Sequence, residues 1–513
     1  MLGTQNHILR ILGATGACCL LLLAHTASIC KESAARPNLI LIVVDTLRAD
    51  HLGCYGYPHD ISPGIDALAA ESVVYERAYS QAPWTVPSLV SLLSSRLPGE
   101  VADWEWWTPV PDEAIMLAEV LASAGYETAA VTSHYYYFRQ EVNLTQGFKH
   151  VEQHPELATT RRSSGRVTNG ANKFIVRHLK SLESDEKVPF FLFLHYFDPH
   201  SPYLYAARDG SQVDGEFRRR LGFSEQEFRT LLENLGETEV KNIDRKLRDM
   251  STLWISSEQD LWPTTKRHGN NDTLLELAKR LYALEVAHVD HSLGSFFSSL
   301  ESMGLLDDTI VVLTSDHGEE FLDHGGWDHA ETVYEEMIRV PLLVRWPERM
   351  GIEPRRIKRP VQLVDVFPTL MRSLGIEIKH SIAGRVLPLD EHEEKPRNSY
   401  VFSESTFILE NQPGYLTPKG GQLGQPYNRA LIWRGYKLIQ QFEPRESYLL
   451  FNLEADPGEK HDLAERMPRK VNKMKELLDT ILDQTRARSI RKTAERPQLS
   501  EEELATLKAL GYL

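Results

Sequence analysis

Cysteine is scarce in this sequence. Only four of the 513 residues are cysteine, and Cys18, Cys19 and Cys30 lie in or next to the first 30 residues. If an export signal is removed beyond Cys30, Cys54 is left alone and no internal disulfide can form. A small disulfide-stapled scaffold is therefore not favoured. With 42% hydrophobic and 25% charged residues, the chain is instead able to bury a large core.

The chain also lacks a surplus of positive charge. Its 57 Lys and Arg residues face 72 Asp and Glu residues, which gives a formal net charge of -15. The phosphate backbone of nucleic acid attracts surfaces rich in Lys and Arg, so we expect no nucleic-acid partner. A neutral or cationic substrate surface, or an anion that enters a locally positive metal pocket, is compatible with this charge.

The first 29 residues have the pattern of an export signal. A weakly basic start at His7 and Arg10 precedes an apolar, leucine-rich run over 11–24 and then small residues. The run is shorter than the roughly 20 apolar residues that a membrane span needs. We predict a signal peptide over 1–29, with an uncleaved membrane anchor as the alternative. The protein is then exported to the periplasm or anchored in a membrane facing it, and an extracellular location stays open.

Three apolar runs bounded by polar residues have the signature of buried parallel strands. They cover 39–44, 190–194 and 309–313. Helical periodicity lies between them, for example over 117–124 and 281–303. Strands that alternate with helices predict an α/β fold, with a parallel sheet covered by helices on both faces.

Ionisable residues follow each of these strands directly. Asp45 follows the first strand, His195 ends the second with His200 close behind, and Asp316 and His317 follow the third. Ligands of open α/β sheets bind beyond the carboxyl ends of the strands. We therefore predict a functional site that gathers these residues at one edge of the sheet.

The composition suggests further divisions of the chain. A catalytic domain is expected over 37–400, with a charged, helix-prone insertion over 206–272. This insertion either shapes substrate choice above the site or is a solvated helical excursion. Shorter apolar runs in 401–465 predict a small antiparallel sheet, and 466–513 has the pattern of a helical tail.

An ordered set of motifs resembles the pattern of one known family. In chain order the motifs are Asp45 with 51–58, then 65–69, Thr85-Val86-Pro87-Ser88, 195–203, Thr314-Ser315-Asp316-His317-Gly318-Glu319, 339–342, 364–370, 436–439 and 453–459. Together they resemble the sulfatase family of the alkaline phosphatase superfamily over 37–465. The resemblance implies an alkaline phosphatase-like, mostly parallel sheet with helices on both faces, plus a small C-terminal antiparallel-sheet subdomain and helical tail.

The departures from the family pattern are as informative as the matches. Thr85 stands where the family oxidises a Cys, or in some bacteria a Ser, to formylglycine, and Thr cannot be converted to that aldehyde. Leu89 replaces an arginine, Thr46 replaces the second aspartate of an opening pair, and 132–135 replaces a stretch that binds the sulfate. Because the lost residues serve the formylglycine and the sulfate, we expect no formylglycine and a direct nucleophile in Thr85.

The resemblance also implies one divalent metal, held by Asp45, Thr85, Asp316 and His317. The loss of a carboxylate at Thr46 and the imidazole of His317 shift the preference from calcium toward manganese or zinc. The identity of the metal stays open among Mn, Zn, Ca and Mg.

Two histidines complete the implied catalytic set with Thr85. His200 and His329 resemble family residues that contact the substrate oxygens and protonate the leaving group. His329 stands where many sulfatases have lysine. The pKa of histidine suits proton delivery near neutral pH.

Several other polar residues have structural interpretations that compete with functional ones. His195 is expected to be a buried, hydrogen-bonded histidine at a strand end. His134 and His324 could restore positive charge near the substrate. Arg48 is expected to make a surface ion pair rather than to reach an anion, and Asp50 and Asp66 are expected to cap helices or turns.

The leading functional prediction is a sulfatase-like, metal-dependent hydrolase or transferase that acts on a sulfate-, phosphate- or phosphonate-type ester outside the cytoplasm. A Thr nucleophile favours phosphoryl or phosphonyl chemistry, because a phosphothreonine can be hydrolysed in line whereas a sulfothreonine lacks the elimination route. The expected substrate is a small-molecule, glycan or lipid-head-group ester, with membrane association through the N-terminus left open. The alternative is a catalytically inactive sulfatase-fold protein that binds a glycan or lipid head group.

Overall fold

The computed structural model describes residues 36–102, 108–153, 164–182, 187–201, 203, 271–393, 399–405, 428–442 and 445–491. The signal or anchor predicted over 1–29, nearly all of the insertion predicted over 206–272 and the end of the predicted tail lie outside the described residues. The described chain from Asn38 onward belongs to one compact unit. Among the described residues, no helix is both long and apolar enough to cross a membrane.

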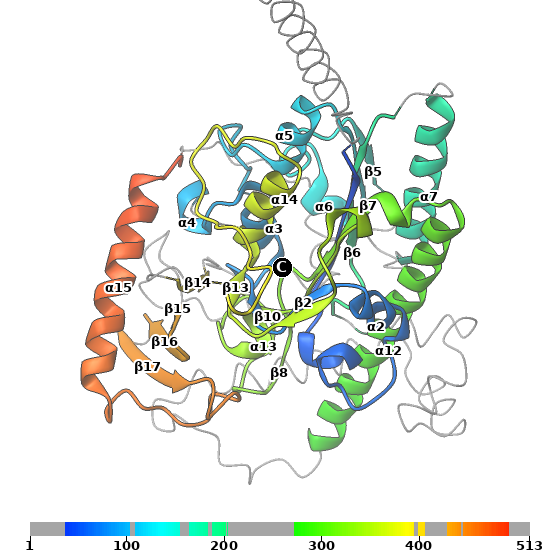
Figure 1. Ribbon diagram of the computed structural model, residues 1–513. Helices are drawn as coiled ribbons and strands as arrows, with labels where there is room; N and C mark the ends of the chain where they lie inside the picture. Colours follow the sequence, from blue (N-terminus) through cyan, green and yellow to red (C-terminus); the bar gives the residue numbers. More distant parts are fainter. Residues whose placement is uncertain are drawn as a thin grey trace, which may run out of the picture. The chain divides into compact units, whose positions relative to one another are not determined.

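An eight-stranded, mostly parallel sheet organises the fold (Figure 1). Its strands, in spatial order, are β12 (Arg355–Ile357), β2 (Val73–Tyr75), β11 (Leu342–Arg345), β7 (Thr309–Thr314), β1 (Asn38–Val44), β6 (Phe190–Tyr196), β4 (Glu127–Thr132) and β5 (His150–Glu152). Within this sheet only β11 runs antiparallel to its neighbours. The three apolar runs predicted as buried strands are β1, β6 and β7, which pair side by side, so the predicted α/β fold class is confirmed.

Alternate residues of the central strand enter two different hydrophobic cores. Residues 39, 41 and 43 of β1 belong to one core and residues 40, 42 and 44 to the other, because successive side chains of a strand point to opposite faces. A strand that is buried on both faces is apolar throughout, which explains the unbroken apolar run in the sequence. Helices α3 (Thr85–Ser94), α5 (Leu117–Ser123) and α14 (Val366–Ser373) cover one face, and α2 (Pro63–Ala70), α7 (Ser164–Ser181) and α12 (Asn271–Ser302) cover the other.

Short elements fill the space between these layers. They are a three-stranded sheet of β10 (Arg339–Val340), β3 (Ala78–Tyr79) and β13 (Val361–Gln362), the pair β8 (Glu320–Phe321) and β9 (Trp327–Asp328), the helices α4 (Pro98–Val101), α6 (Tyr135–Phe138) and α13 (Glu335–Ile338), and the 3-10 helices η1 (Ala49–His51), η2 (Gly53–Tyr55), η4 (Leu306–Asp308), η5 (Glu348–Met350) and η6 (Leu363–Asp365). The segment from β8 to α13 follows β7 and carries several site residues.

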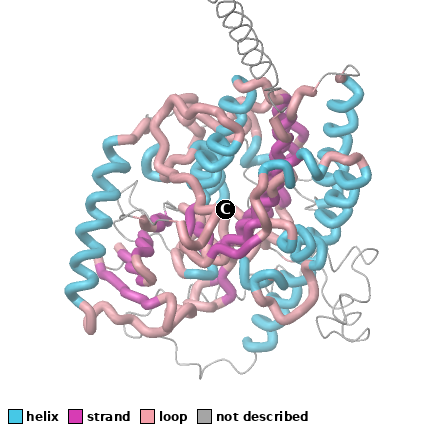
Figure 2. Tube along the Cα trace, viewed as in Figure 1, coloured by secondary structure: helices cyan, strands magenta, loops and turns pink. Residues whose placement is uncertain are grey.

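A four-stranded antiparallel sheet forms the predicted C-terminal subdomain. Its strands are β14 (Val401–Ser405), β15 (Asn428–Trp433), β16 (Tyr436–Gln441) and β17 (Ser447–Asn452). One face packs against α15 (Pro468–Ala487), which is the described part of the predicted helical tail. The other face packs against Met337 and Ile338 of α13. Figure 2 shows the strands of this sheet in magenta beside the cyan α15 helix.

Candidate active site and metal centre

Three central strands end at the same edge of the main sheet. Val43 of β1 lies in register with His195 of β6 on one side and with Thr314 of β7 on the other. Asp45 follows β1 and Asp316 follows β7, so the strand pairing brings together residues that are far apart in the chain. The prediction that these residues gather at one sheet edge is correct.

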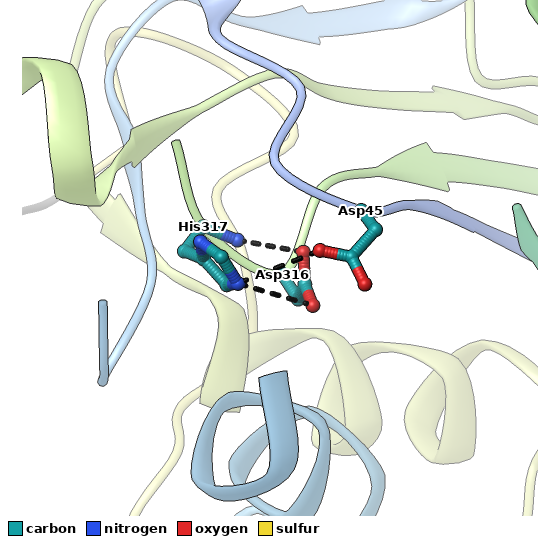
Figure 3. Close-up of side chains that lie close together, drawn as sticks. All are labelled: Asp45, Asp316 and His317. Atoms are coloured by element: carbon teal, nitrogen blue, oxygen red, sulfur yellow. Dashed lines mark hydrogen bonds and ion pairs between the residues drawn. The ribbon is translucent and has the colours of Figure 1, made fainter. Parts of the chain in front are cut away.

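Asp45, Asp316 and His317 form a cluster, here called the metal cluster (Figure 3). Nε2 of His317 lies 3.5 Å from Oδ1 of Asp45 and 3.6 Å from Oδ2 of Asp316, and all three side chains are fully buried. The backbone N–H groups of His317 and Thr46 donate to Oδ1 of Asp316, at 2.9 and 3.3 Å. Oδ2 of Asp316 is therefore the oxygen that remains for a ligand.

The loop after β7 orients the ring of His317. Nδ1 lies 2.9 Å from the carbonyl oxygen of Gly318, so Nδ1 carries the hydrogen and Nε2 carries the lone pair. Only glycine fits at position 318, because a Cβ there would lie 1.8 Å from the carbonyl oxygen of Glu336. Nε2 thus presents a lone pair to two carboxylates, which is the orientation of a metal-ligating histidine.

The chemistry of the metal cluster suits a cation. Both carboxylate oxygens of Asp45 and Oδ2 of Asp316 are buried without a hydrogen bond of normal geometry to any described residue. Burial, followed by the charge of Asp316, raises the pKa of Asp45 well above its ordinary value, and burial lowers the pKa of His317 to about 4. Buried charges are costly unless they are paired or coordinate a metal. Two carboxylates and an imidazole therefore fit one divalent cation.

Thr85 begins α3, a helix in which every residue is buried. Its Oγ1 lies 3.4 Å from Nε2 of His317, and its contact with Asp45 partly offsets the effect of burial on the pKa of that carboxyl. Ser88 ties the helix to the metal cluster, because its hydroxyl donates to the carbonyl oxygen of Asp316 at 2.6 Å. The unpaired N–H groups in the first turn of a helix stabilise an anion; in α3 these are the N–H groups of Thr85 and Val86, because Pro87 has none and that of Ser88 donates to the carbonyl oxygen of Trp84.

His329 lies beside the metal cluster. The centroid of its ring is 4.7 Å from that of His317 and 4.7 Å from that of His200. Nδ1 of His329 is 2.7 Å from Oδ1 of Asp328 and 3.1 Å from Oε1 of Glu319. Burial lowers the pKa of His329, but the charges of Asp328 and Glu319 outweigh burial and raise it well above its ordinary value. The two carboxylates thus favour the protonated form of His329.

His200 supplies a third imidazole. Its Nδ1 lies 2.8 Å from the carbonyl oxygen of Ser201, its ring stacks on Phe197 with centroids 4.4 Å apart, and only 5% of the residue is exposed. The structure thus brings together every residue predicted for the site. Asp45, Thr85, Asp316 and His317 surround one position, and His200 and His329 lie next to it.

His195 is buried as predicted, but its surroundings differ from the prediction. Neither ring nitrogen has a hydrogen-bond partner among the described residues, so the expectation of a hydrogen-bonded histidine is wrong. Nε2 lies 3.6 Å from Oδ2 of Asp45, and burial lowers the pKa of His195 to about 3. A neutral ring at this distance is placed to orient Asp45 or the cation beside it.

Two carboxylates at the site were missed from the sequence. Glu319 and Asp328 both contact Nδ1 of His329, and Glu319 is fully buried. Burial raises the pKa of Glu319 to about 7, although His329 acts in the opposite direction. A local signal was present, since Glu319 comes two residues after His317 and Asp328 directly precedes His329. Their convergence on one nitrogen depends on the turn between β8 and β9.

Two further histidines have partners that explain them without substrate. His134 caps α6, because its Nδ1 accepts the backbone N–H of Tyr137 at 3.3 Å. His324 pairs with Glu336, with Nδ1 and Oε1 2.6 Å apart, and belongs to a cluster away from Thr85.

Arg48 makes ion pairs, as expected, with Asp50 at 2.7 Å and Asp323 at 2.9 Å. The prediction of a surface ion pair is wrong in one respect, since Arg48 is buried. Asp66 caps the 3-10 turn η2, as predicted, because its Oδ1 accepts the backbone N–H of Cys54 at 2.7 Å. Asp50 was also predicted as a cap, but it pairs with the side chains of Arg48 and His51 instead. These residues shape the segment after β1 rather than the reacting centre.

Thr46 and Leu89, two residues that depart from the family pattern, are both fully buried. Leu89 is fully buried in the core on the α3 face of the sheet, where an arginine would bury a charge. Thr46 has a left-handed backbone with φ 53°, and its buried hydroxyl has no hydrogen-bond partner among the described residues. The apolar core therefore suits Leu89, whereas Thr46 combines an unfavourable backbone conformation for a β-branched residue with an unpartnered hydroxyl among the described residues.

Comparisons with known proteins agree with this site. A model of the Sulfatase family matches residues 37–376, and a model of the C-terminal region of N-sulphoglucosamine sulphohydrolase matches residues 323–488. The first match contains the main sheet and the metal cluster, and the second contains the C-terminal sheet and α15. Fold and site define an ester hydrolase of the alkaline phosphatase type with a divalent-metal centre. The chain belongs to the sulfatase family.

Curated relatives match over most of their length. An N-acetylglucosamine-6-O-sulfatase of Bacteroides thetaiotaomicron is 24% identical and covers 90% of this chain and 88% of its own. An arylsulfatase of Clostridium perfringens is 23% identical and covers 86% of this chain and 94% of its own.

Solved structures show the same fold. A phosphonate monoester hydrolase of Agrobacterium radiobacter matches with a TM-score of 0.64 and 19% identity, over 88% of this chain and 96% of its own. A protein solved in complex with its substrate D-glucosamine-2-N,6-O-disulfate matches with a TM-score of 0.64 and 19% identity, over 88% of this chain and 98% of its own. At this identity the likeness establishes the architecture alone.

Proposed function

We propose that this protein hydrolyses a phosphate- or phosphonate-type ester, with Thr85 as a direct nucleophile in place of formylglycine. The observation that carries this proposal is the position of the Thr85 hydroxyl, 3.4 Å from Nε2 of His317 at the start of α3. A hydroxyl at this place can attack a tetrahedral ester centre, whereas Thr cannot form the aldehyde hydrate of the formylglycine mechanism.

The chain supplies the groups that an in-line displacement needs. The Thr85 hydroxyl releases its proton to water, and its oxygen attacks phosphorus while the bond from phosphorus to the leaving oxygen breaks. The protonated His329 donates to that leaving oxygen. In the second half, water attacks the phosphothreonine, His329 takes a proton from this water, and the Thr85 oxygen leaves and is reprotonated. The net reaction converts ester and water to alcohol and acid.

Charge that develops on the non-bridging oxygens is met by groups that are already in place. The protein supplies the backbone N–H groups of Thr85 and Val86 at the start of α3 and the imidazole of His329, whose pKa is raised by Asp328 and Glu319. A divalent ion held by Asp45, Asp316 and His317 would lower the pKa of a nearby hydroxyl and withdraw charge from the ester oxygens. Imidazole together with carboxylate ligands favours manganese or zinc over calcium.

Phosphorus is favoured over sulfur by the fate of the covalent intermediate. A phosphothreonine ester is hydrolysed by in-line attack of water, which regenerates Thr85. A sulfothreonine cannot collapse by the elimination that frees sulfate from a formylglycine hydrate. The phosphonate monoester hydrolase among the similar structures supports phosphoryl chemistry on this fold, and the sulfatase relatives support sulfate esters as the competing substrates.

The competing function is a protein that binds a glycan or lipid head group without turning it over. The replacements at Thr46 and Leu89 favour it, because they remove family residues that serve catalysis. The N-terminal pattern supports export in either case, with the site acting outside the cytoplasm.

Thr85→Ala is the decisive variant, with Thr85→Ser as the matched control that keeps a hydroxyl. Both are assayed with nitrophenyl phosphate, phosphonate and sulfate after loading with Mn, Zn, Ca or Mg. We expect Thr85→Ala to lower kcat/KM for the phosphonate by at least about 10³-fold, roughly 4 kcal/mol, and Thr85→Ser to retain much of the activity. Mass spectrometry of rapidly quenched wild-type enzyme should find the phosphoryl group on Thr85.

Two results would contradict the proposal. Sulfate turnover that survives Thr85→Ala would exclude Thr85 as the nucleophile. Metal binding by the wild type without turnover of any of the three esters would favour the binding function instead.

A further inference from the structure

Three cations without acidic partners lie together in the C-terminal subdomain. Arg434 lies in the turn between β15 and β16, and Lys470 and Lys473 lie near the start of α15. We call these residues the basic cluster. Within the part of the chain that the structure describes, none of the three has an ion pair, whereas Arg486 and Arg488 near the end of the same helix pair with Asp483 and Glu100.

One aromatic surface holds the basic cluster together. Cζ of Arg434 lies 4.5 Å from the ring centroid of Trp433, and Nζ of Lys473 and Nζ of Lys470 lie 5.4 and 5.7 Å from it. Nζ of Lys470 is also 4.0 Å from the ring centroid of Tyr436. Contacts of this kind stabilise exposed cations by about 0.5–1 kcal/mol each. The rings therefore concentrate positive charge at one place and limit the motion of the side chains.

Folding by itself does not favour this concentration of charge. Burial, then the charges of Arg434 and Lys473, lower the pKa of Lys470. The first turn of α15 contains no acidic residue, although the positive end of a helix dipole favours anions there. Arg434 and Gly435 both have left-handed backbones, with φ 52° and 78°, in a turn where Asn and Gly are the usual residues. The chain carries a net charge of -15, yet within the described part of the chain no carboxylate forms an ion pair with these cations.

We propose that the basic cluster binds a polyanionic glycan, a polymer whose sulfate, phosphate or carboxylate groups repeat along its length. Fixed cations suit such a polymer because its anionic groups are themselves spaced regularly along a stiff chain. The polymer bound at the basic cluster would carry the ester that Thr85 attacks. In this respect the proposal rests on the proposed function.

An anionic membrane is the less suitable partner. Membrane-binding surfaces add large apolar side chains that insert below the head groups. The exposed large hydrophobic residues of the described chain are Val151, Val176, Leu179 and Val386, and none of them belongs to the C-terminal sheet or to α15. Screening limits the repulsion from acidic residues elsewhere to about 8 Å at physiological salt, so a local cationic surface can act within an acidic protein.

The test uses the full-length protein and a heparin octasaccharide as the probe. The triple variant Arg434→Gln, Lys470→Gln and Lys473→Gln removes the basic cluster. Its matched control, Arg280→Gln, Arg349→Gln and Arg486→Gln, removes the same charge from cations that pair with Glu276, Asp308 and Asp483. Titration calorimetry at several salt concentrations should give at least about a tenfold weaker affinity for the first variant and a shallower salt dependence, by about one power of salt for each lost contact.

The control variant should bind as the wild type does. Equal losses in both variants, or no binding by the wild type, would overturn the proposal, and so would binding to phosphatidylserine vesicles without binding to the octasaccharide. Turnover of nitrophenyl phosphonate is measured in parallel and should be unchanged in both variants. If turnover is absent throughout while the octasaccharide still distinguishes the two variants, the proposed function fails and the glycan site stands.

Discussion

Two clusters of acidic residues and histidine include residues from the segment after β7. They differ in what compensates the negative charge of their carboxylates. In the metal cluster, the Nε2 lone pair of His317, both carboxylate oxygens of Asp45 and Oδ2 of Asp316 lie close together, and these oxygens have no hydrogen-bond partner among the described residues. In the second cluster, which we call the Lys437 cluster, Nζ of Lys437 lies 3.0 Å from Oε1 of Glu459 and 3.3 Å from Oε1 of Glu335, and His324 pairs with Glu336. The carboxylates of the second cluster are therefore met by side-chain cations.

The comparison teaches that residue types do not distinguish a metal site from a buried ion-pair cluster. Lys437 is fully buried, and although burial lowers its pKa, Glu459 and Glu335 outweigh burial and raise it. Lys437 thus occupies the role that a metal ion would take in the first cluster. Because Glu335 begins α13 while Lys437 and Glu459 belong to the C-terminal region, the Lys437 cluster fastens the subdomain to the catalytic domain.

The largest expected effect is at Asp45. Asp45→Asn should lower kcat/KM by at least about 10³-fold, roughly 4 kcal/mol, because it removes a carboxylate ligand. In excess chelator, however, the variant should be more stable than the wild type, because a buried carboxylate without a partner is destabilising. Activity assays and thermal unfolding with EDTA measure both effects, with the exposed Asp307→Asn as control. A variant that is less stable than the wild type in EDTA would show that Asp45 already has a stabilising partner in the protein.

In the Lys437 cluster, we expect removal of one charged group to destabilise the protein rather than to stabilise it. Lys437→Met should lower the free energy of unfolding by about 3–5 kcal/mol, because it leaves the buried carboxylate of Glu459 and the largely buried one of Glu335 without their cation. Urea unfolding measures the loss, and exposed Lys358→Met is the control. Adding Glu459→Gln should recover part of the stability, since one unpaired charge is then removed. Equal effects of Lys437→Met and Lys358→Met would remove the contrast between the two clusters.

A smaller effect is expected on the pH dependence of stability. Burial and the charge of Glu335 outweigh Lys437 and raise the pKa of Glu459 to about 7, from an ordinary value of 4.5. The stability contributed by the protonated carboxyl is complete below pH 4.5 and is lost as the pH rises through about 7. Glu459→Gln should therefore flatten the fall in unfolding free energy between pH 5 and pH 8, by about 2 kcal/mol. Exposed Glu454→Gln should leave the slope unchanged, and an unchanged slope in Glu459→Gln would contradict the assignment.

Much of the architecture followed from patterns within single strands. The apolar runs at 39–44, 190–194 and 309–313 became β1, β6 and β7 because a strand buried on both faces must be apolar at every position. The ligand candidates Asp45 and His317 were found because the edge of a parallel sheet is where such strands end. These inferences needed only the order of residues along the chain.

The surroundings of the side chains could not be inferred in the same way. His195 and His324 looked alike as isolated histidines, yet His195 faces Asp45 without a hydrogen bond and His324 pairs with Glu336. Glu319 was missed because its contact with His329 depends on how β8 turns into β9. In each case the partner is set by packing between segments that the chain order does not place together.

The sequence by itself determined the sulfatase fold, the sheet edge that carries the site, and the presence of Thr85 where formylglycine chemistry requires a cysteine. Local periodicity and residue identity suffice for these conclusions, because backbone geometry fixes which side chains share a face or a strand end. Only the tertiary structure decided which acidic groups remain free for a cation and which are neutralised by Lys437. Burial makes charge pairing a condition of folding, and the identity of the partner depends on contacts between distant segments.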